Sequence, residues 1–190
     1  MDHVSLKLIT MSSRRTANFN ANKKEPLSPD HLVKSDSIRD KANPVHSTAY
    51  TAIVFGFFTA LRRSNIAPPS TQEYDPAKHL SRGDVSFNAD GFTVSLKWTK
   101  TLQDRSKTFD IPVANPPPGA IINPVAIVAD FFASFPVRST DPAFSFYDST
   151  HQKLYVLTQS FLNKIIKDWI QALGLNPLMY SSHSIRRGSA

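Results

Sequence analysis

The sequence contains no cysteine among its 190 residues. Disulfide bonds and thiolate metal sites are therefore excluded, which fits a reducing compartment. Apolar runs are short as well: none reaches the roughly eighteen residues of a membrane-spanning helix, so we expect no such helix. Residues 1–10 lack the basic segment and long apolar block of a signal peptide, and we expect none.

Acidic residues are outnumbered by basic ones. The chain has 15 Asp and Glu against 22 Lys and Arg, which gives a net charge of +7 at pH 7 and a pI of about 9.7. This surplus favours a polyanionic partner such as a nucleic acid. An ordinary soluble basic protein would carry the same charge, so the charge alone leaves both interpretations open.

The apolar pattern predicts several helices and a meander of strands. Helix starts are predicted from capping residues and prolines, and strands from an apolar period of two. The predicted helices begin at Pro29, at Ser47 or Thr48, at Pro124, after Thr158 and after Ser182, and the predicted strands are residues 84–87, 92–98 and 107–113. Gly174 is predicted to follow the end of the helix that starts after Thr158, and residues 88–91 are a predicted turn. Residues 144–146 and 153–156 are predicted to be short extended pieces. Residues 1–22 show no period and are predicted to be a disordered arm or linker remnant before a domain at residues 23–190.

Two adjacent arginines follow the most hydrophobic predicted helix. Arg62 and Arg63 come directly after Leu61. A cation at a helix C-terminus complements the helix dipole, which is a sufficient structural reason for one of them. A second arginine beside a core helix is costly unless it has an anionic partner. We expect the core to hold Arg62 at the floor of an anion site, although on this stretch alone both explanations weigh equally.

Lys100 lies in the predicted hairpin tip between the second and third strands. The tip, residues 99–106, is polar. A lysine at the start of such a tip can swing into a groove, but most hairpin lysines are simply solvated. Lys100 therefore proves little by itself.

The last predicted helix carries His183 and Arg186. Their separation by three residues places both on one helix face, and Ser182 as N-cap would leave backbone N–H groups facing outward. An imidazole, a bidentate guanidinium and the positive end of the helix dipole together can hold a phosphate. A His-x-x-Arg sequence alone is more often a solvated basic helix end, so its weight depends on other basic residues upstream.

In this order the motifs resemble the catalytic domain of the tyrosine recombinases, the phage-integrase family of DNA breaking and rejoining enzymes. The resemblance rests on residues 57–62 (Phe-Phe-Thr-Ala-Leu-Arg), 96–101 (Leu-Lys-Trp-Thr-Lys-Thr) and 183–188 (His-Ser-Ile-Arg-Arg-Gly). Residues 61–70 and 98–103 are especially similar to recombinases of eukaryotic mobile elements. Because residues 26–29 (Pro-Leu-Ser-Pro) resemble the family's domain opening, the resemblance covers residues 23–190.

The resemblance implies a fold, a site and a partner. The fold would be α+β and mostly helical, a tyrosine-recombinase catalytic-domain fold with a small three-stranded antiparallel sheet. Arg62 would be the first phosphate-binding arginine, and Lys100 would protonate the departing 5′ oxygen. His183 and Arg186 would be the second pair, in which the arginine clamps a non-bridging oxygen and the histidine assists proton transfer.

Double-stranded DNA is the partner that the resemblance implies, with a homo-oligomer on the DNA as a further expectation. No metal, small-molecule cofactor or membrane is implied, and the expected compartment is the nucleus or another intracellular compartment that contains DNA. The chemistry accounts for the residue types. Attack on a phosphodiester builds negative charge on its oxygens, so two fixed guanidinium groups stabilise the transition state more than the ground state. The alkoxide is a poor leaving group, which explains the acid at Lys100.

Two features depart from the family pattern. Asn65 stands where many relatives carry an acidic residue. The family's nucleophilic tyrosine follows the His-x-x-Arg pair, whereas all tyrosines here precede His183. They are Tyr50, Tyr74, Tyr147, Tyr155 and Tyr180. We therefore expect a domain that is truncated at its C-terminus and does not cleave DNA alone.

Three interpretations stay open. The first is a recombinase-family domain for DNA integration or recombination that cannot cleave by itself. The second is a non-catalytic DNA-binding or repurposed remnant of a mobile-element recombinase. The third is a basic α/β domain of another class, such as an RNA-binding one, which lacks support because the predicted strands show no ring of exposed aromatic residues.

Overall fold

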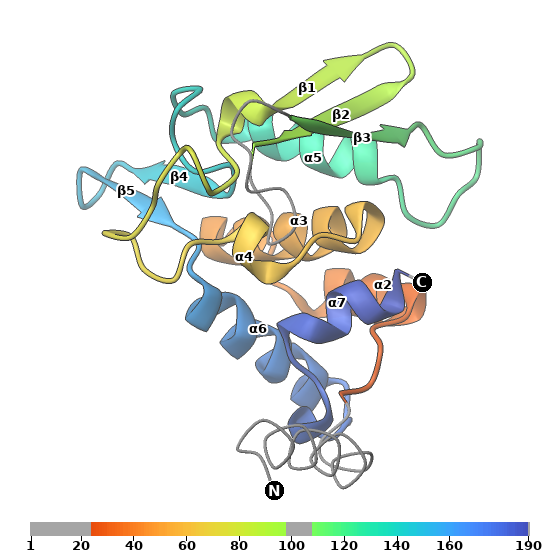
Figure 1. The fold of residues 1–190 in the computed structure, drawn as a ribbon. Helices are drawn as coiled ribbons and strands as arrows, with labels where there is room; N and C mark the ends of the chain where they lie inside the picture. The colour runs from red at the N-terminus through yellow and green to blue at the C-terminus, as the bar shows by residue number, and fades with distance from the viewer. Residues whose placement is uncertain (1–23, 98–107, 190) are drawn as a thin grey trace, which may run out of the picture.

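The structure is a computed structural model that describes residues 24–97 and 108–189. The described helices are α2 (Pro29–Ile38), α3 (Pro44–Thr59), α4 (Arg63–Ile66), α5 (Pro124–Ser134), α6 (Gln159–Ala172) and α7 (Ser182–Gly188), with the 3-10 turns η1 (Arg82–Asp84) and η2 (Pro177–Met179). The described strands are β1 (Val85–Asn88), β2 (Gly91–Leu96), β3 (Phe109–Ala114), β4 (Ser145–Asp148) and β5 (Lys153–Val156). The predicted α+β, mostly helical class with a small antiparallel sheet is confirmed (Figure 1).

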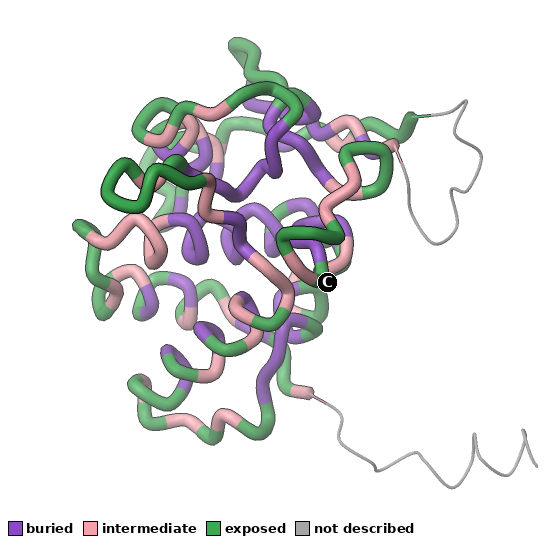
Figure 2. The backbone as a smooth tube through the Cα atoms, turned by 90° about the vertical axis from the view of Figure 1, so that its left-hand side faces the viewer, coloured by how far each residue is buried: buried purple, intermediate pink, exposed green. Residues whose placement is uncertain are grey.

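Helix α3 is the centre of the domain. Every residue from Thr48 to Phe57 is buried, as expected for a helix that is apolar nearly all round. The three-stranded sheet and α5 lie on one side of α3, and α2, α6 and α7 lie on the other (Figure 1). Buried residues therefore concentrate in the middle of the domain, where both groups of elements meet α3 (Figure 2).

Aromatic rings fill the space between α3 and the sheet. Phe55 of α3 stacks on Phe92 of β2 with ring centroids 5.6 Å apart, and Phe144 meets Phe55 edge-on at 5.1 Å. All three side chains are at most 1% exposed. Such pairs contribute about 0.5–1.5 kcal/mol beyond the apolar area they bury, so this cluster fixes the sheet against α3.

The main sheet has the order β1-β2-β3 with antiparallel neighbours. Its register pairs Phe92 with Val113 and Val94 with Ile111, which places the apolar side chains on the face toward α3. Gly91 begins β2 at φ +147°, where a Cβ atom would overlap the carbonyl oxygen of Val113, so glycine is required there. The predicted meander is confirmed as far as the described residues extend.

Helices α2, α6 and α7 cover the opposite side of α3 (Figure 1). The side chain of Thr158 accepts a hydrogen bond from the backbone N–H of Phe161 and so caps α6, and Gly174 follows its end at φ +76°. Both features match the prediction. The buried face of α6 consists of Leu162, Ile165, Ile166, Trp169 and Ile170.

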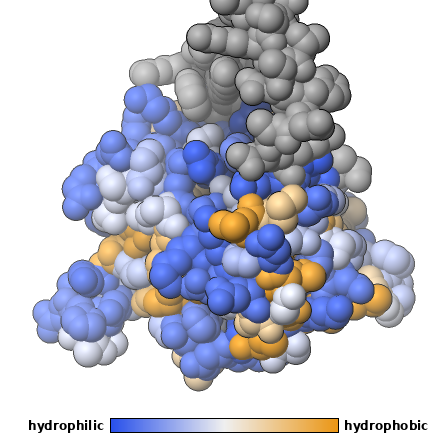
Figure 3. All heavy atoms as spheres, turned by 90° about the horizontal axis from the view of Figure 1, so that it is seen from below, coloured by the Kyte–Doolittle hydropathy of each residue, from blue (hydrophilic) through white to orange (hydrophobic). Residues whose placement is uncertain are grey.

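The surface on this side is mixed. The face seen from below in Figure 3 is largely hydrophilic, with small apolar areas between. Exposed apolar side chains include Val33 of α2 and Leu178 of η2, which is ordinary for a protein surface. Within residues 24–97 and 108–189, none of the helices has the length and apolarity needed to cross a membrane.

Two helix starts differ from the prediction. Helix α3 begins at Pro44 with Asn43 as its N-cap, rather than at Ser47 or Thr48, because a proline is well suited to the first helical position. Helix α7 is capped by Ser181 rather than Ser182, since the side chain of Ser181 accepts from the backbone N–H of His183.

The predicted extended pieces near residues 144–146 and 153–156 are confirmed and pair as the hairpin β4–β5.

Candidate functional site

The side chain of Arg62 lies at the surface and is not held by the core. Helix α3 ends at Thr59, and Ala60 adopts a left-handed conformation with φ 53°. This reversal turns Leu61 inward, where it is 6% exposed, and leaves Arg62 exposed as the N-cap residue of α4. The expectation that the core holds Arg62 is therefore wrong. Among the described residues, Arg62 has no ion pair or hydrogen-bonded acceptor for its side chain.

Helix α7 presents its basic residues on the outside and its small ones on the inside. Ser182, Ser184 and Ile185 are buried, whereas His183 and Arg186 are exposed. The buried side is held firmly, because the side-chain oxygen Oδ1 of Asn163 on α6 accepts from the backbone N–H of Ser182 at 3.1 Å. In the part of the chain that the structure describes, no carboxylate pairs with either exposed side chain.

A single glycine brings the two arginine-bearing segments together. A Cβ atom on Gly56 of α3 would lie 2.5 Å from Cδ1 of Ile66 on α4 and 3.2 Å from Cγ2 of Ile185 on α7. Both short helices therefore pack against α3 at the same point. Arg62 begins α4 and Arg186 directly follows Ile185, so two motifs more than one hundred residues apart in the sequence meet on one residue of the core.

Lys100, the third element of the expected site, lies outside the described residues. Lys97, the residue that follows β2, forms an ion pair. Lys97 places its Nζ atom 2.6 Å from Oδ1 of Asp84, and the buried Asp84 carboxylate also accepts from the backbone N–H and hydroxyl of Ser81. Lys97 is thus held to η1.

Sequence reasoning missed both Asp84 and Lys97. Ser81 and Asp84 form a capping box around η1, and the Ser-x-x-Asp spacing is a readable signal for it. The partner Lys97 could not be read in the same way, because its contact crosses from β2 to η1. The fixed Asp84–Lys97 pair leaves Lys97 without free charge for a ligand, in contrast to Arg62 and Arg186.

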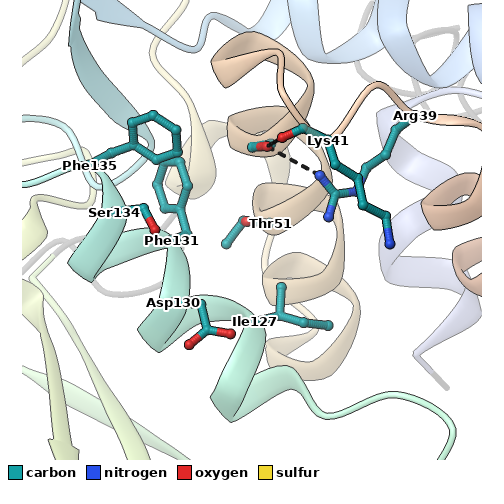
Figure 4. A pocket seen from close by; sticks show the side chains of 9 residues that line it. Arg39, Lys41, Thr51, Ile127, Asp130, Phe131, Ser134 and Phe135 are labelled. Carbon is teal, nitrogen blue, oxygen red and sulfur yellow. Dashed lines mark hydrogen bonds between the residues drawn. The ribbon is translucent and has the colours of Figure 1, made fainter.

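A cavity of about 260 Å³ lies between α3 and α5, on a different part of the domain (Figure 4). Its lining consists of Arg39, Lys41, Ser47, Thr51, Ile127, Asp130, Phe131, Ser134 and Phe135. Its two basic side chains are already paired: Asp36 lies 2.7 Å from Nε of Arg39 and 2.9 Å from Nζ of Lys41. None of the expected site residues lines this cavity.

Asp36 is ionised through this pairing. Burial acts to raise the pKa of Asp36, but the hydrogen bonds and charges of Lys41 and Arg39 outweigh burial and hold that pKa below its usual value. The guanidinium of Arg39 also lies over the ring of Tyr50, 4.6 Å from its centroid. The two cations at this cavity, Arg39 and Lys41, are balanced by two carboxylates, those of Asp36 and Asp130, so the cavity has no surplus of positive charge for an anion.

Metal binding has no support in the described residues. Residues 24–97 and 108–189 contain no group of three or more His, Asp or Glu side chains placed to hold a metal ion. The chemistry available at α4 and α7 is instead that of fixed cations. Two guanidinium groups and an imidazole donor suit an anion with several oxygens, such as a phosphate.

Comparison with known proteins defines the fold. No protein-family model matches the sequence, and no curated protein matches it. Solved structures do match, and they have the tyrosine-recombinase fold. One is the XerH site-specific recombinase bound to difH substrate in a pre-cleavage complex, with a TM-score of 0.54 and 16% identity over 88% of this chain and 42% of that chain. Another is its post-cleavage complex with palindromic difH, with a TM-score of 0.56 and 19% identity over 88% of this chain and 41% of that chain.

The protein thus has a tyrosine-recombinase-like fold, as the motifs indicated. At these identities the likeness shows the fold alone. The chain spans less than half of the length of the XerH chains that it matches.

Proposed function

We propose that this protein binds double-stranded DNA through a phosphate site at α4 and α7, as a recombinase domain in DNA integration or recombination. The observation that supports the proposal is the meeting of α4 and α7 at Gly56, with Arg62, His183 and Arg186 exposed and unpaired among the described residues. The matching XerH structures are of a recombinase bound to its DNA substrate. The resemblance to recombinases of eukaryotic mobile elements makes the nucleus the proposed compartment.

Each site residue has a proposed role in strand cleavage. Arg62 and Arg186 clamp the non-bridging oxygens of the phosphate at which the DNA is cut, where they stabilise the charge of the transition state. His183 assists proton transfer, and Lys100 protonates the departing 5′ oxygen. The roles of donors and cations need no metal, and for Arg62, His183 and Arg186 they fit exposed side chains that have no carboxylate partner among the described residues.

The nucleophile is the part that residues 1–190 do not supply. All five tyrosines precede Arg186 in the sequence, whereas the proposed mechanism needs a tyrosyl oxygen from a segment that follows it. Residues 1–190 therefore bind DNA and do not cleave it alone. A longer subunit in a homo-oligomer on the DNA would supply the tyrosine in trans.

A non-catalytic DNA-binding protein on the same fold is the second candidate. An RNA-binding sheet is disfavoured by the structure. The outward face of the described strands carries Ser86, Asn88, Thr93, Ser95, Asp110 and Pro112. It offers no aromatic platform on which bases could stack.

The binding proposal is tested by a salt titration. Fluorescence anisotropy with an unrelated duplex of about 30 base pairs should show weak, sequence-tolerant binding whose logarithm falls linearly with that of the salt concentration. Replacing both Arg62 and Arg186 with alanine should reduce the slope by about 2, since each lost phosphate contact removes about 0.9.

The matched control is Arg39→Ala, which removes an arginine that is already paired with Asp36. Its slope should stay that of the unmodified protein. Binding that is the same at low and high salt, or an equal loss in both variants, would refute the phosphate site.

A further inference from the structure

Residues 24–28, the first described residues of the chain, lie along α7 and are called the strap below. The backbone N–H of Glu25 donates to the carbonyl oxygen of Met179 at 2.7 Å, and the backbone N–H of Leu27 donates to the carbonyl oxygen of Ser184 at 2.9 Å. The guanidinium of Arg187 donates to the carbonyl oxygen of Lys24. The helix that carries His183 and Arg186 is therefore held from outside by a segment about 150 residues earlier in the sequence.

The strap and α7 also meet without any intervening side chain. A Cβ atom on Gly188 would overlap the carbonyl oxygen of Leu27 and would lie 2.8 Å from Cε2 of Phe57. The side chain of Leu27 is 5% exposed and belongs to the core. The strap is thus an ordered part of the domain that packs directly against α7.

His31 closes the junction between the strap and α2. The backbone N–H of Ser28 donates to Nδ1 of His31 at 3.1 Å, and the hydroxyl oxygen of Ser28 accepts from the backbone N–H of His31 at 3.3 Å. A capping box ordinarily uses Glu or Gln at this place. His31 can accept this bond only while its Nδ1 carries no proton, because a protonated Nδ1 would be a second donor facing the backbone N–H of Ser28.

The same ring touches the segment that enters α7. His31 meets the ring of Tyr180 edge-on, with centroids 5.6 Å apart, and Tyr180 precedes the N-cap residue Ser181. Tyr180 is itself 8% exposed. One imidazole therefore contacts the end of the strap and the start of the segment that leads into α7.

The charges around His31 do not stabilise an imidazolium. Burial lowers the pKa of His31 from its usual 6.5, Lys34 on the same helix lowers it further, and Asp30 opposes them more weakly. Among the described residues, no carboxylate outside α2 acts on this ring, and Tyr180 is the titratable group that faces it from the C-terminal segment.

We propose that His31 is a positioning residue for the DNA site, in which a neutral imidazole locks the strap onto α7 and acid releases the lock. When the ring gains a proton, Ser28 loses its acceptor, the strap loosens from Met179 and Ser184, and His183 and Arg186 lose their fixed placement. The last step rests on the proposed DNA binding; the lock itself does not.

The sign of the effect follows from the direction of the pKa shift. The unfolded chain takes up a proton at His31 more readily than the folded one, so stability from the lock is complete above pH 6.5 and is lost as pH falls through the lower folded pKa.

The test compares His31→Gln with a control histidine. Glutamine can accept the same N–H bond and cannot take up a proton. His151→Gln is the matched control, because His151 pairs with Asp148 in an exposed turn. Hydrogen exchange of the Leu27 amide, which donates to Ser184, reports on the lock without DNA.

Between about pH 7.5 and about pH 5.5, the protection of Leu27 in the unmodified protein should fall by about tenfold after correction for intrinsic exchange. The same fall is expected in His151→Gln and none in His31→Gln. An equal fall in all three proteins would overturn the lock. If His31→Gln fails to fold, NMR decides: the Leu27 amide shift must titrate with the His31 ring, and separate midpoints refute the proposal.

DNA anisotropy at constant salt then tests the positioning. The ratio of the DNA affinity of His31→Gln to that of the unmodified protein should be about 1 at neutral pH. It should rise in acid by the factor by which the exchange data lower the locked fraction of the unmodified protein, about tenfold where one molecule in about ten stays locked. A ratio that stays constant while the opened form becomes the major one would refute the positioning role alone. If no variant binds DNA at any pH, the proposed function fails, and the exchange result still decides the lock.

Discussion

Arg39 and Lys41, at the end of α2, and Arg62 and Arg186, at α4 and α7, carry the same charge in different settings. The first pair shares the carboxylate of Asp36, whereas the second pair has no carboxylate partner among the described residues. The charge of the first pair holds the turn between α2 and α3. The second pair keeps its charge for a ligand, which is the difference between a structural and a functional basic cluster.

Arg82 shows a third setting, in which the arginine is part of the core. It is 8% exposed, its guanidinium lies 3.9 Å from the ring centroid of Phe132, and it donates to the carbonyl oxygen of Ser145 at 2.9 Å. Burial lowers the pKa of Arg82 to about 10, and Asp141 opposes the shift. The side chain therefore stays charged at neutral pH, and its role is to join η1 to α5 and β4.

The largest expected effect concerns strand cleavage. In a mixture with a longer subunit that supplies the tyrosine, Arg62→Ala or Arg186→Ala in this chain should lower cleavage by about a hundredfold or more, since a lost transition-state ligand costs about 3 kcal/mol. Arg39→Ala should leave the rate unchanged. The measurement is the yield of covalent protein–DNA adduct on a denaturing gel with a nicked suicide substrate.

Alone, the 190-residue chain should form no such adduct with the same substrate. An adduct that survives denaturation and maps to any of its tyrosines would show that the assignment of the site is wrong.

A smaller effect, on the free energy of unfolding, is expected from Gly188→Ala, which adds a methyl group where α7 meets the strap. A methyl group there would overlap the carbonyl oxygen of Leu27, and overpacking of this kind costs about 1–3 kcal/mol. Urea unfolding should show a loss of about 2 kcal/mol. Gly119→Ala is the control, because Gly119 has φ +83° but nothing within 4 Å of the added atom, so only about 1 kcal/mol of backbone strain is expected. Equal losses in both variants would mean that α7 does not depend on this close approach.

The smallest effect is expected from Asp36→Asn, which frees Arg39 and Lys41. Partly exposed pairs of this kind are worth about 0.5 kcal/mol each, so urea unfolding at neutral pH should show a loss of about 1 kcal/mol. Because the folded pKa of Asp36 lies below 3.8, its contribution is present above pH 3.8 and is lost as pH falls through the folded value. The difference between the proteins should therefore shrink in strong acid.

The DNA affinity of the same variant gives a second test of the difference between the paired cations at Asp36 and the unpaired cations at α4 and α7. The salt slope of Asp36→Asn should equal that of the unmodified protein, because the freed cations lie at the cavity between α3 and α5. A steeper slope would show that the pairing with Asp36, rather than position, is what keeps this cluster from binding DNA.

Helix ends, turns and strand alternation could be predicted from the sequence, because residues that are neighbours in the chain decide them. Pro29 after Ser28, Thr158 before α6 and Gly174 after it predicted helix ends that the structure confirms. The turn at Gly91 and the alternation of β2 likewise predicted the meander. Three motifs in order then indicated the fold, because each element they lie on could be recognised separately.

The candidate site was only half readable. The sequence identified Arg62, His183 and Arg186 by type and order, but it predicted a core-held Arg62 where the structure has an exposed one. The reason is the left-handed Ala60, a single residue whose type does not announce that conformation. The pairing of Lys97 with Asp84 was hidden for a similar reason, since it joins two elements through space.

Three features follow from the sequence alone. They are the types of the helices and strands, the surplus of positive charge, and the residue types that are available to bind a phosphate. These follow from period, capping and composition, which act over a few residues. The tertiary structure alone decided which cations are free. Asp36 lies close enough to two of them to pair, whereas α4 and α7 meet at Gly56 with their cations facing outward. Contacts between residues far apart in the chain depend on how the helices pack, and packing depends on the shape of the whole core.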